Sequence, residues 1–224
     1  MVDCFACPRL VAWREQVARE KRAAYAEEEY WGRPAPGFGD PDASVIVVGL
    51  APAAHGANRT GRVFTGDRSG DWLFRAMYRA GLANQPASVH RGDGLELSGA
   101  WVSAAVRCAP PANKPTPEER DTCRPWLVRE LELLTRLRVA VVLGGFGYSA
   151  LLSALKAGGR SVPVPRPKFG HGVEVELEGL TLVCSYHPSQ QNTFTGRLTE
   201  PMLDSVFARA TELAELPLSP PPAG

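Results

Sequence analysis

Short apolar runs alternate along this chain with segments of helical apolar spacing. The runs at residues 45–48, 100–106 and 139–143 are rich in valine and alanine, which indicates strands buried on both faces. Residues 181–184 form a fourth run, and strict alternation over residues 173–177 indicates a half-exposed strand. Because strands that alternate with helices form parallel sheets, we expect an α/β fold with both faces of the sheet covered.

Helices are expected between these strands. A segment rich in Ala, Glu and Arg predicts a first helix over residues 10–30. Ser69 is the expected N-cap of the helix after the first strand, which leaves Asp67 available for chemistry. Thr116 and Glu119 form a capping box around Pro117, which predicts a helix to about residue 137. Two further helices are expected at residues 145–155 and 200–215.

Polar clusters follow three of the predicted strands, at residues 51–68, 107–114 and 187–192. The first is too long for a plain connection, and long loops in compact domains are commonly functional. The carboxyl ends of parallel strands meet at one edge of a sheet. We therefore expect the three clusters to converge on one site.

Composition limits the class of protein. The chain has 224 residues, of which 44% are hydrophobic, and this predicts one domain over residues 1–216 with a Pro-rich disordered tail at residues 217–224. The net charge of +1 means that any nucleic-acid surface is local. No basic segment precedes an apolar run at the start, and no stretch approaches the ~18 apolar residues of a membrane span. We expect a cytoplasmic monomer that does not contact membranes.

Four of the five cysteines have the spacing of a metal centre. Cys4 and Cys7 form a short pair, and Cys108 and Cys123 follow far downstream, which suits one tetrahedral metal ion or one [4Fe-4S] cluster. The spacing favours cluster and zinc equally, and buried thiols without metal are the structural alternative. Cys184 lies in a strand and is expected in the core.

Other motifs separate the possible enzyme classes. Gly145, Gly147 and Ala150 follow a strand as in a dinucleotide-binding fingerprint, but the acidic residue required ~20 positions later is absent. This argues against a nucleotide-dependent iron–sulfur oxidoreductase. His187 follows the fourth strand among polar residues, where a functional role is favoured over a structural one.

Two stretches resemble motifs of the uracil-DNA glycosylase superfamily. Residues 49–62 (GLAPAAHGANRTGR) with residues 64–67 (FTGD) resemble its first motif, and residues 187–189 (HPS) resemble its second. Leu50 and Ala51 lack a carboxylate or amide, which is typical of the fifth family, the B-type enzymes of thermophiles and actinobacteria. The resemblance implies a three-layer α/β/α sandwich with a four-stranded parallel sheet. It also implies a [4Fe-4S] cluster on the four cysteines and a nucleoid-associated protein of a bacterium or archaeon.

The same resemblance implies a monofunctional glycosylase of base excision repair, which flips a deaminated base out of DNA and hydrolyses its N-glycosidic bond. The implied catalytic residues are Asp67, Asn113 and His187. The implied base pocket comprises Gly49, Leu50, Ala51, Ala53, Phe64 and Ala104. The implied DNA contacts are Arg59, Arg62, Arg68, Lys114, Gln190, Gln191, Asn192 and Arg197. Only Lys114 of the lysines lies near a motif, so a Schiff-base lyase is disfavoured.

The expected substrate range depends on two apolar positions. The related fourth family places an asparagine at the position of Ala104 and a glutamate at that of Leu50, and the amide reads the edge of uracil. Leu50 and Ala104 cannot form side-chain hydrogen bonds, so a base other than uracil leaves no polar group of theirs unpaired. We therefore expect the enzyme to accept hypoxanthine besides uracil. The alternative from another class is a zinc- or cluster-stabilised DNA-binding module without catalysis.

Overall fold

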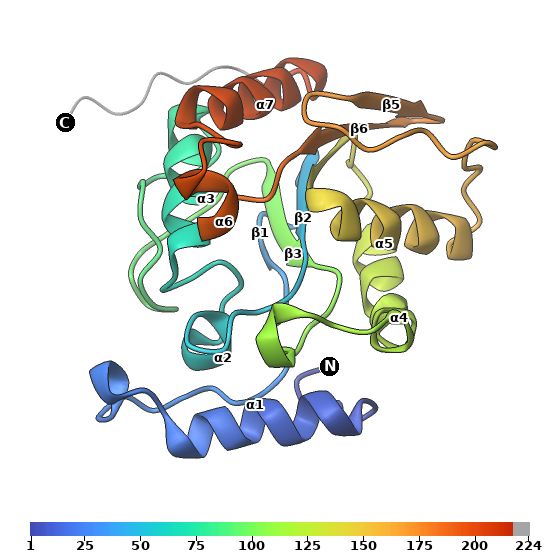
Figure 1. The fold of residues 1–224 in the computed structure, drawn as a ribbon. Coiled ribbons are helices and arrows are strands. Elements are labelled where there is room, and N and C mark those ends of the chain that lie inside the picture. The colour runs from blue at the N-terminus through green and yellow to red at the C-terminus, as the bar shows by residue number, and fades with distance from the viewer. Residues whose placement is uncertain (217–224) are drawn as a thin grey trace.

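Six strands form one mixed sheet at the centre of the structure, a computed structural model that describes residues 1–216 (Figure 1). The predicted tail at residues 217–224 lies outside the described residues. In sheet order the strands are β1 (Phe38–Gly39), β3 (Ala100–Ala104), β2 (Val45–Gly49), β4 (Val139–Leu143), β6 (Leu180–Ser185) and β5 (Glu174–Leu177).

The four central strands β3, β2, β4 and β6 are parallel, as the apolar runs predict. The edge strands β1 and β5 are antiparallel to their neighbours, so the expected four-stranded parallel sheet is the core of a larger mixed one. The half-exposed strand expected at residues 173–177 is β5. β1 has only two residues and lies within a Pro/Gly segment, so no hydrophobic periodicity in the sequence predicts it.

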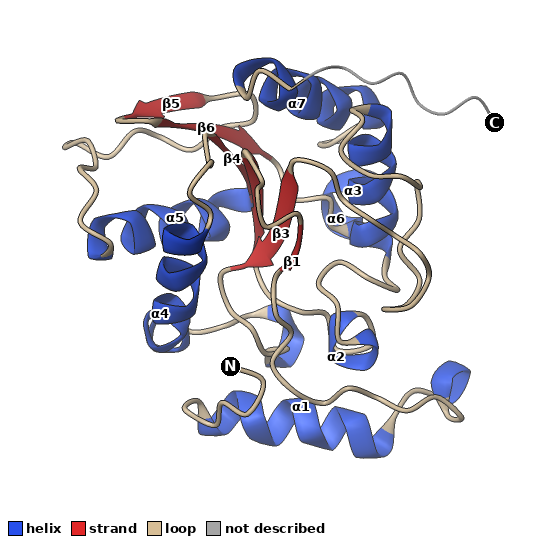
Figure 2. Cartoon of the chain, turned by 180° about the vertical axis from the view of Figure 1, so that it is seen from behind, coloured by secondary structure: helices blue, strands red, loops and turns tan. Residues whose placement is uncertain are grey.

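Helices cover both faces of the sheet, which gives three layers (Figures 1 and 2). Val47 on β2 is buried against one pair of helices and its neighbour Val48 against the other, because successive side chains of a strand point to opposite faces. The first pair is α3 (Arg68–Arg79) and α7 (Glu200–Leu213), and the second is α4 (Pro117–Leu133) and α5 (Gly144–Ala157).

The helix at the N-terminus is shorter than predicted. α1 spans Pro8–Glu20 and ends where the backbone of Lys21 takes φ 55°, so the expected helix over residues 10–30 is wrong in its second half. The chain beyond it runs to Glu28, which pairs with Arg59, so a long-range contact overrides helix propensity. The capping box of Thr116 and Glu119 is confirmed at α4. The short helices are η1 (Ala23–Tyr25), α2 (Ala57–Thr60), η2 (Pro111–Asn113) and α6 (Gln190–Phe194).

Candidate active site and four-cysteine site

The loops after β2, β3 and β6 converge at the carboxyl edge of the parallel strands. Gly49 at the end of β2 lies opposite Ala104 at the end of β3. Pairing continues past the strands, because the amide of Ala105 donates to Gly49 O at 3.0 Å. The loop after β6 joins them through His187, whose ring centroid lies 5.9 Å from that of Phe64. The structure therefore brings two of the three predicted clusters, those after β2 and β6, together beside Gly49, while the third cluster begins at the neighbouring end of β3.

Phe64 forms the aromatic wall of this site. Its ring packs on the backbone of Gly49 so closely that a Cβ there would lie 2.5 Å from Phe64 Cζ. The planes of Phe64 and His187 are inclined by 30°. Phe64 holds φ 54°, a conformation that bulky residues rarely adopt and that is commonly found at functional sites. The glycine and the strained backbone together set the position of the aromatic ring.

Asp67 caps the helix that follows the loop. Its Oδ1 accepts a hydrogen bond from the backbone N–H of Gly70 at 3.0 Å, so Asp67 and not Ser69 is the N-cap of α3. The expectation of Ser69 as N-cap is therefore wrong, because the Asp67 carboxylate already reaches the first helical turn. The other oxygen, Oδ2, lies against the backbone of Gly56, where a Cβ would be 2.3 Å away. Burial raises the pKa of Asp67, and the backbone bonds to its carboxylate oppose this.

His187 is held as a neutral imidazole. Burial lowers its pKa to about 4, so the ring is uncharged at neutral pH. Asn192 donates to the backbone oxygen of His187 at 2.9 Å and fixes the turn after β6. A Cβ at Gly144 would lie 3.3 Å from that of His187, so the start of α5 packs tightly beside the histidine. A neutral ring N–H can donate a hydrogen bond to a group that gains negative charge.

The remaining predicted pocket residues lie at different depths. Ala104 is buried beside Gly49 in the same core cluster as Phe64. Leu50, Ala51 and Ala53 are half-buried along the loop. Asn113 stands apart: it is exposed on η2 with φ 55°, and no contact ties its side chain to Phe64 or His187 in the described part of the chain.

Two of the predicted DNA contacts are buried and paired inside the protein. Arg59 is 8% exposed, bonds Glu28 and lies 4.0 Å from the ring centroid of Tyr25. Arg62 is 6% exposed and reaches Asp93 at 2.7 Å. Burial opposes ionisation of Asp93, but the hydrogen bonds from Arg62 still lower its pKa to about 2. The structure contradicts Arg59 and Arg62 as phosphate contacts, because both guanidinium groups are buried and paired with carboxylates of the protein itself.

The other predicted DNA contacts lie on the surface. Arg68, Lys114 and Arg197 are exposed, as are Gln190 and Gln191 on α6, while Asn192 is half-buried. The resemblance implies that residues 189–197 enter the minor groove, but the sequence does not single out Phe194, whose ring is 66% exposed at the end of α6 and lies 4.6 Å from the guanidinium of Arg68. An aromatic residue directly after the polar run that follows β6 was the available signal.

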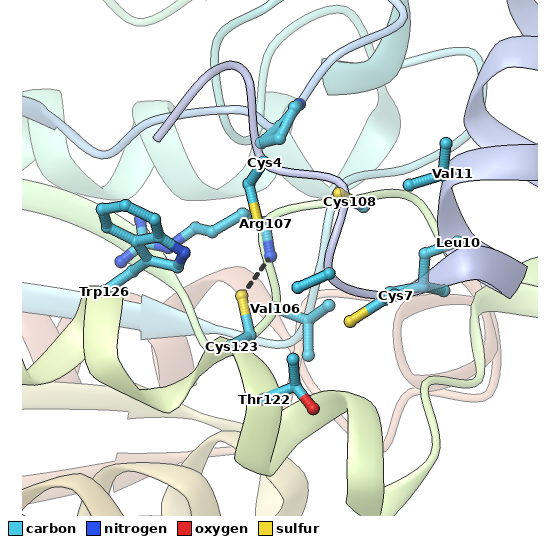
Figure 3. A pocket seen from close by; sticks show the side chains of 12 residues that line it. Cys4, Cys7, Leu10, Val11, Val106, Arg107, Cys108, Thr122, Cys123 and Trp126 are labelled. Carbon is cyan, nitrogen blue, oxygen red and sulfur yellow. Dashed lines mark hydrogen bonds between the residues drawn. The ribbon is translucent and has the colours of Figure 1, made fainter.

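The four predicted metal-ligating cysteines line one pocket between α1, α4 and the loop after β3 (Figure 3). Cys4 and Cys7 are half-buried, and Cys108 and Cys123 are buried. Burial raises the pKa of the Cys108 thiol and raises that of Cys123 to about 12. Within residues 1–216, no three His, Cys, Asp or Glu side chains are set to hold a single metal ion.

Two of the four sulfur atoms accept a hydrogen bond from a nitrogen donor. The backbone N–H of Arg107 donates to Cys123 Sγ at 3.3 Å (Figure 3), and Arg14 Nη1 donates to Cys108 Sγ at 3.0 Å. Nε of both arginines and Nη1 of Arg107 are buried without a partner in the described structure. Four thiols on one pocket, two of them accepting hydrogen bonds from nitrogen donors, fit a group that binds through four thiolates.

No helix among the described residues is long and apolar enough to cross a bilayer.

Comparison with known proteins identifies the family. A sequence model described as the uracil DNA glycosylase superfamily matches residues 36–211. A type-5 uracil-DNA glycosylase of Mycobacterium bovis is 56% identical over 213 residues, which cover 94% of this chain and 78% of the relative. Those of Thermus thermophilus and Pyrobaculum aerophilum are 52% identical over 217 residues (96% of each chain) and 48% identical over 210 residues (94% and 88%). A type-4 uracil-DNA glycosylase of P. aerophilum is 30% identical over 159 residues, 69% of this chain and 70% of the relative. These matches confirm the family that the motifs at the carboxyl edge resemble: the chain belongs to the uracil-DNA glycosylase superfamily and, within it, to the type-5 family.

Proposed function

We propose that this chain is a monofunctional DNA glycosylase that removes uracil and other deaminated bases during base excision repair. The observation that carries the proposal is the pair of Phe64 and His187 beside the glycine that ends β2, with Asp67 three residues after Phe64 in the same loop. An aromatic face, a carboxylate and a neutral imidazole are the groups that a flipped base and a cationic sugar require. The relatives named as uracil-DNA glycosylases support the substrate.

The proposed reaction hydrolyses the N-glycosidic bond. The base stacks on Phe64 while the bond between the base nitrogen and C1′ of the sugar breaks, and the electron pair leaves with the base. His187 donates a hydrogen bond from its ring to the base as negative charge develops there. Asp67 stabilises the cationic sugar and orients the water that adds to C1′, and the proton of that water passes to solvent. Preorganised charges of this kind commonly contribute the largest share of catalysis.

Asn113 is proposed to complete the catalytic set. Its location on η2, in the loop after β3, supports this, because the loops that carry Asp67 and His187 leave the sheet at the same edge. Because its side chain is exposed, it is free to reach a base that enters from the surface. The pocket walls are proposed to be Gly49, Leu50, Ala51, Ala53 and Ala104.

DNA is proposed to lie across α6 and the start of α3. Arg68, Lys114 and Arg197 are exposed cations that can contact phosphates, and Gln190, Gln191 and Asn192 lie on α6. We propose that Phe194 enters the minor groove beside the lesion, because an exposed apolar ring can wedge between base steps. The stack on Arg68 holds this ring near the N-terminus of α3. The chain is proposed to act on chromosomal DNA of the nucleoid as a monomer.

A [4Fe-4S] cluster is the proposed occupant of the four-cysteine pocket. Cys4, Cys7, Cys108 and Cys123 would hold it, and family membership with a four-thiol donor set supports this. Because these cysteines come from the start of α1, from α4 and from the loop after β3, a bound cluster would cross-link the three segments. Purified protein is expected to be brown and to contain iron and acid-labile sulfide, and a colourless, zinc-loaded, active protein would contradict the proposal.

The proposed substrate range includes hypoxanthine. Ala104 and Leu50 offer no side-chain hydrogen bond, so no buried polar group is left unpaired when a purine replaces uracil. Selection then depends partly on how readily a damaged pair opens, which favours mispaired uracil over paired uracil.

The activity is tested with uracil-containing duplex DNA, followed by alkali to cleave abasic sites. Strand cleavage that requires both uracil and alkali supports a monofunctional glycosylase. Binding without abasic sites would favour the alternative, a cluster- or zinc-stabilised DNA-binding module, and cleavage without alkali would indicate a lyase. Hypoxanthine-containing duplex with excess enzyme tests the range, and efficient uracil release without hypoxanthine release would refute the broad pocket.

A further inference from the structure

Arg14 is a buried cation that lacks an adequate carboxylate partner. It lies on α1 with only 1% of its surface exposed. The carboxylate in reach is that of Glu15, whose oxygen is 3.9 Å away and whose side chain is 40% exposed. Burying a charge without a partner is unfavourable, so the surroundings of Arg14 must supply negative charge.

The surroundings of Arg14 are the four-cysteine pocket. Arg14 Nη1 donates to Cys108 Sγ at 3.0 Å and to the backbone oxygen of Cys4 at 3.1 Å. A protonated thiol would give this buried cation almost nothing, whereas a thiolate gives it a full opposite charge. Arg107, the second buried arginine at the pocket, has Glu130 at 2.6 Å. Arg14 is therefore the cation whose charge the sulfur centre must balance.

The same residue also reaches the loop of the candidate active site. Asn58 on α2 is 1% exposed, and its side-chain amide donates to the backbone oxygen of Arg14 at 3.1 Å. α2 lies within the loop that carries Phe64 and Asp67. One residue thus contacts the sulfur centre through its guanidinium and the catalytic loop through its carbonyl.

We propose that Arg14 is a positioning residue that balances the charge of an anionic four-thiolate centre and couples that centre to the active-site loop. The inference rests on the proposed cluster in the four-cysteine pocket. A cluster held by four thiolates is anionic, and its reduction adds a further negative charge. Charge and hydrogen bonds at the sulfurs set the reduction potential, so Arg14 stabilises the reduced form and raises the potential.

The test compares the wild type with Arg14→Gln, Arg14→Lys and the control Arg19→Gln, which removes a charge from an exposed position of the same helix. Three quantities are measured on the full-length protein: the reduction potential of the cluster, the rate of iron loss to a chelator, and amide hydrogen exchange over residues 55–66. None of them depends on turnover.

Arg14→Gln is expected to shift the potential to a more negative value and to release iron about tenfold faster, a loss typical of groups that support metal ligands. Exchange over residues 55–66 is expected to rise, because α1 loses the contacts of the Arg14 guanidinium to Cys108 and Cys4. Arg14→Lys keeps the charge and should recover part of the shift in potential, while Arg19→Gln should match the wild type.

Two kinds of failure are distinguishable. If the wild type holds iron but Arg14→Gln matches Arg19→Gln in potential and iron loss, the proposed role of Arg14 is overturned while the cluster stands. If the wild type contains no iron and takes up none when supplied with iron and sulfide, the cofactor proposal fails and the role of Arg14 falls with it. If Arg14→Gln does not fold, Arg14→Met decides, because it keeps an unbranched side chain but removes the charge: a wild-type potential and a wild-type rate of iron loss in that variant contradict the inference.

Discussion

Asp67 caps α3 and is proposed to stabilise the transition state, and substitution with asparagine tests the two roles separately. Its Oδ1 caps α3 through the N–H of Gly70, while the charge of the carboxylate is proposed to stabilise the transition state. Asparagine caps helices about as well as aspartate but carries no charge. Asp67→Asn should therefore leave the free energy of unfolding nearly unchanged and lower the rate, whereas Asp67→Ala should lose both.

The magnitudes follow from these tasks. Loss of the cap in Asp67→Ala is expected to cost about 1 kcal/mol of stability. Loss of a preorganised charge is expected to raise the barrier by ~2–4 kcal/mol, which is about 30- to 900-fold in single-turnover rate. Burial raises the pKa of Asp67, so the wild-type rate should rise with pH through a value above that of an ordinary carboxyl group. Asp67→Asn should lose this acid limb.

The assay is single-turnover uracil release with excess enzyme, together with urea unfolding of each variant. Asp71→Asn is the matched control, because it removes an exposed carboxylate from the first turn of the same helix. Its rate is expected to stay within about twofold of the wild type, under ~0.5 kcal/mol. An Asp67→Asn enzyme with the wild-type rate and pH profile would show that Asp67 only caps α3.

Further predictions follow from other parts of the structure. The pKa of His187 is about 4 in the fold and near 6.5 when unfolded, so the unfolded state binds the extra proton first as pH falls, and stability should decrease between pH 6.5 and 4 by up to about 3 kcal/mol. His187→Asn should flatten this slope, as urea unfolding across the range can measure, and an equal slope in both proteins would contradict a neutral imidazole in the fold. Ala104→Asn should narrow the substrate range towards uracil, measured as the ratio of uracil to hypoxanthine release, and an unchanged ratio would place the selectivity elsewhere. Phe194→Ala should slow the release of uracil from duplex DNA more than the release of uracil from single strands, because a ring that inserts between base pairs is needed only where bases are stacked in a duplex. Equal effects on both substrates would exclude this role for Phe194. Thr116→Ala should cost about 1 kcal/mol of stability through loss of the capping box at α4 without changing the rate, as urea unfolding and uracil release can verify, and an unaltered midpoint would show that the box is redundant.

Sequence by itself determined the parts of this protein that depend on local pattern. The apolar runs at residues 45–48 and 139–143 specified buried parallel strands, because only a strand covered on both faces tolerates such continuous hydrophobicity. Thr116 and Glu119 fixed the start of α4 through bonds within four residues. The motif around Gly49 identified the family, since its loop composition is specific to the site it forms.

Tertiary structure alone decided which polar side chains face inward. In the sequence, Arg59 and Arg62 look no different from basic residues that are exposed. In the fold, both are buried and form ion pairs with Glu28 and Asp93 from distant segments. Arg14 lies in an ordinary helical pattern, and only the approach of Cys108, 94 residues away, gives its charge a partner. Charged side chains are buried or exposed according to the partners that long-range folding brings to them, and no local periodicity encodes those partners.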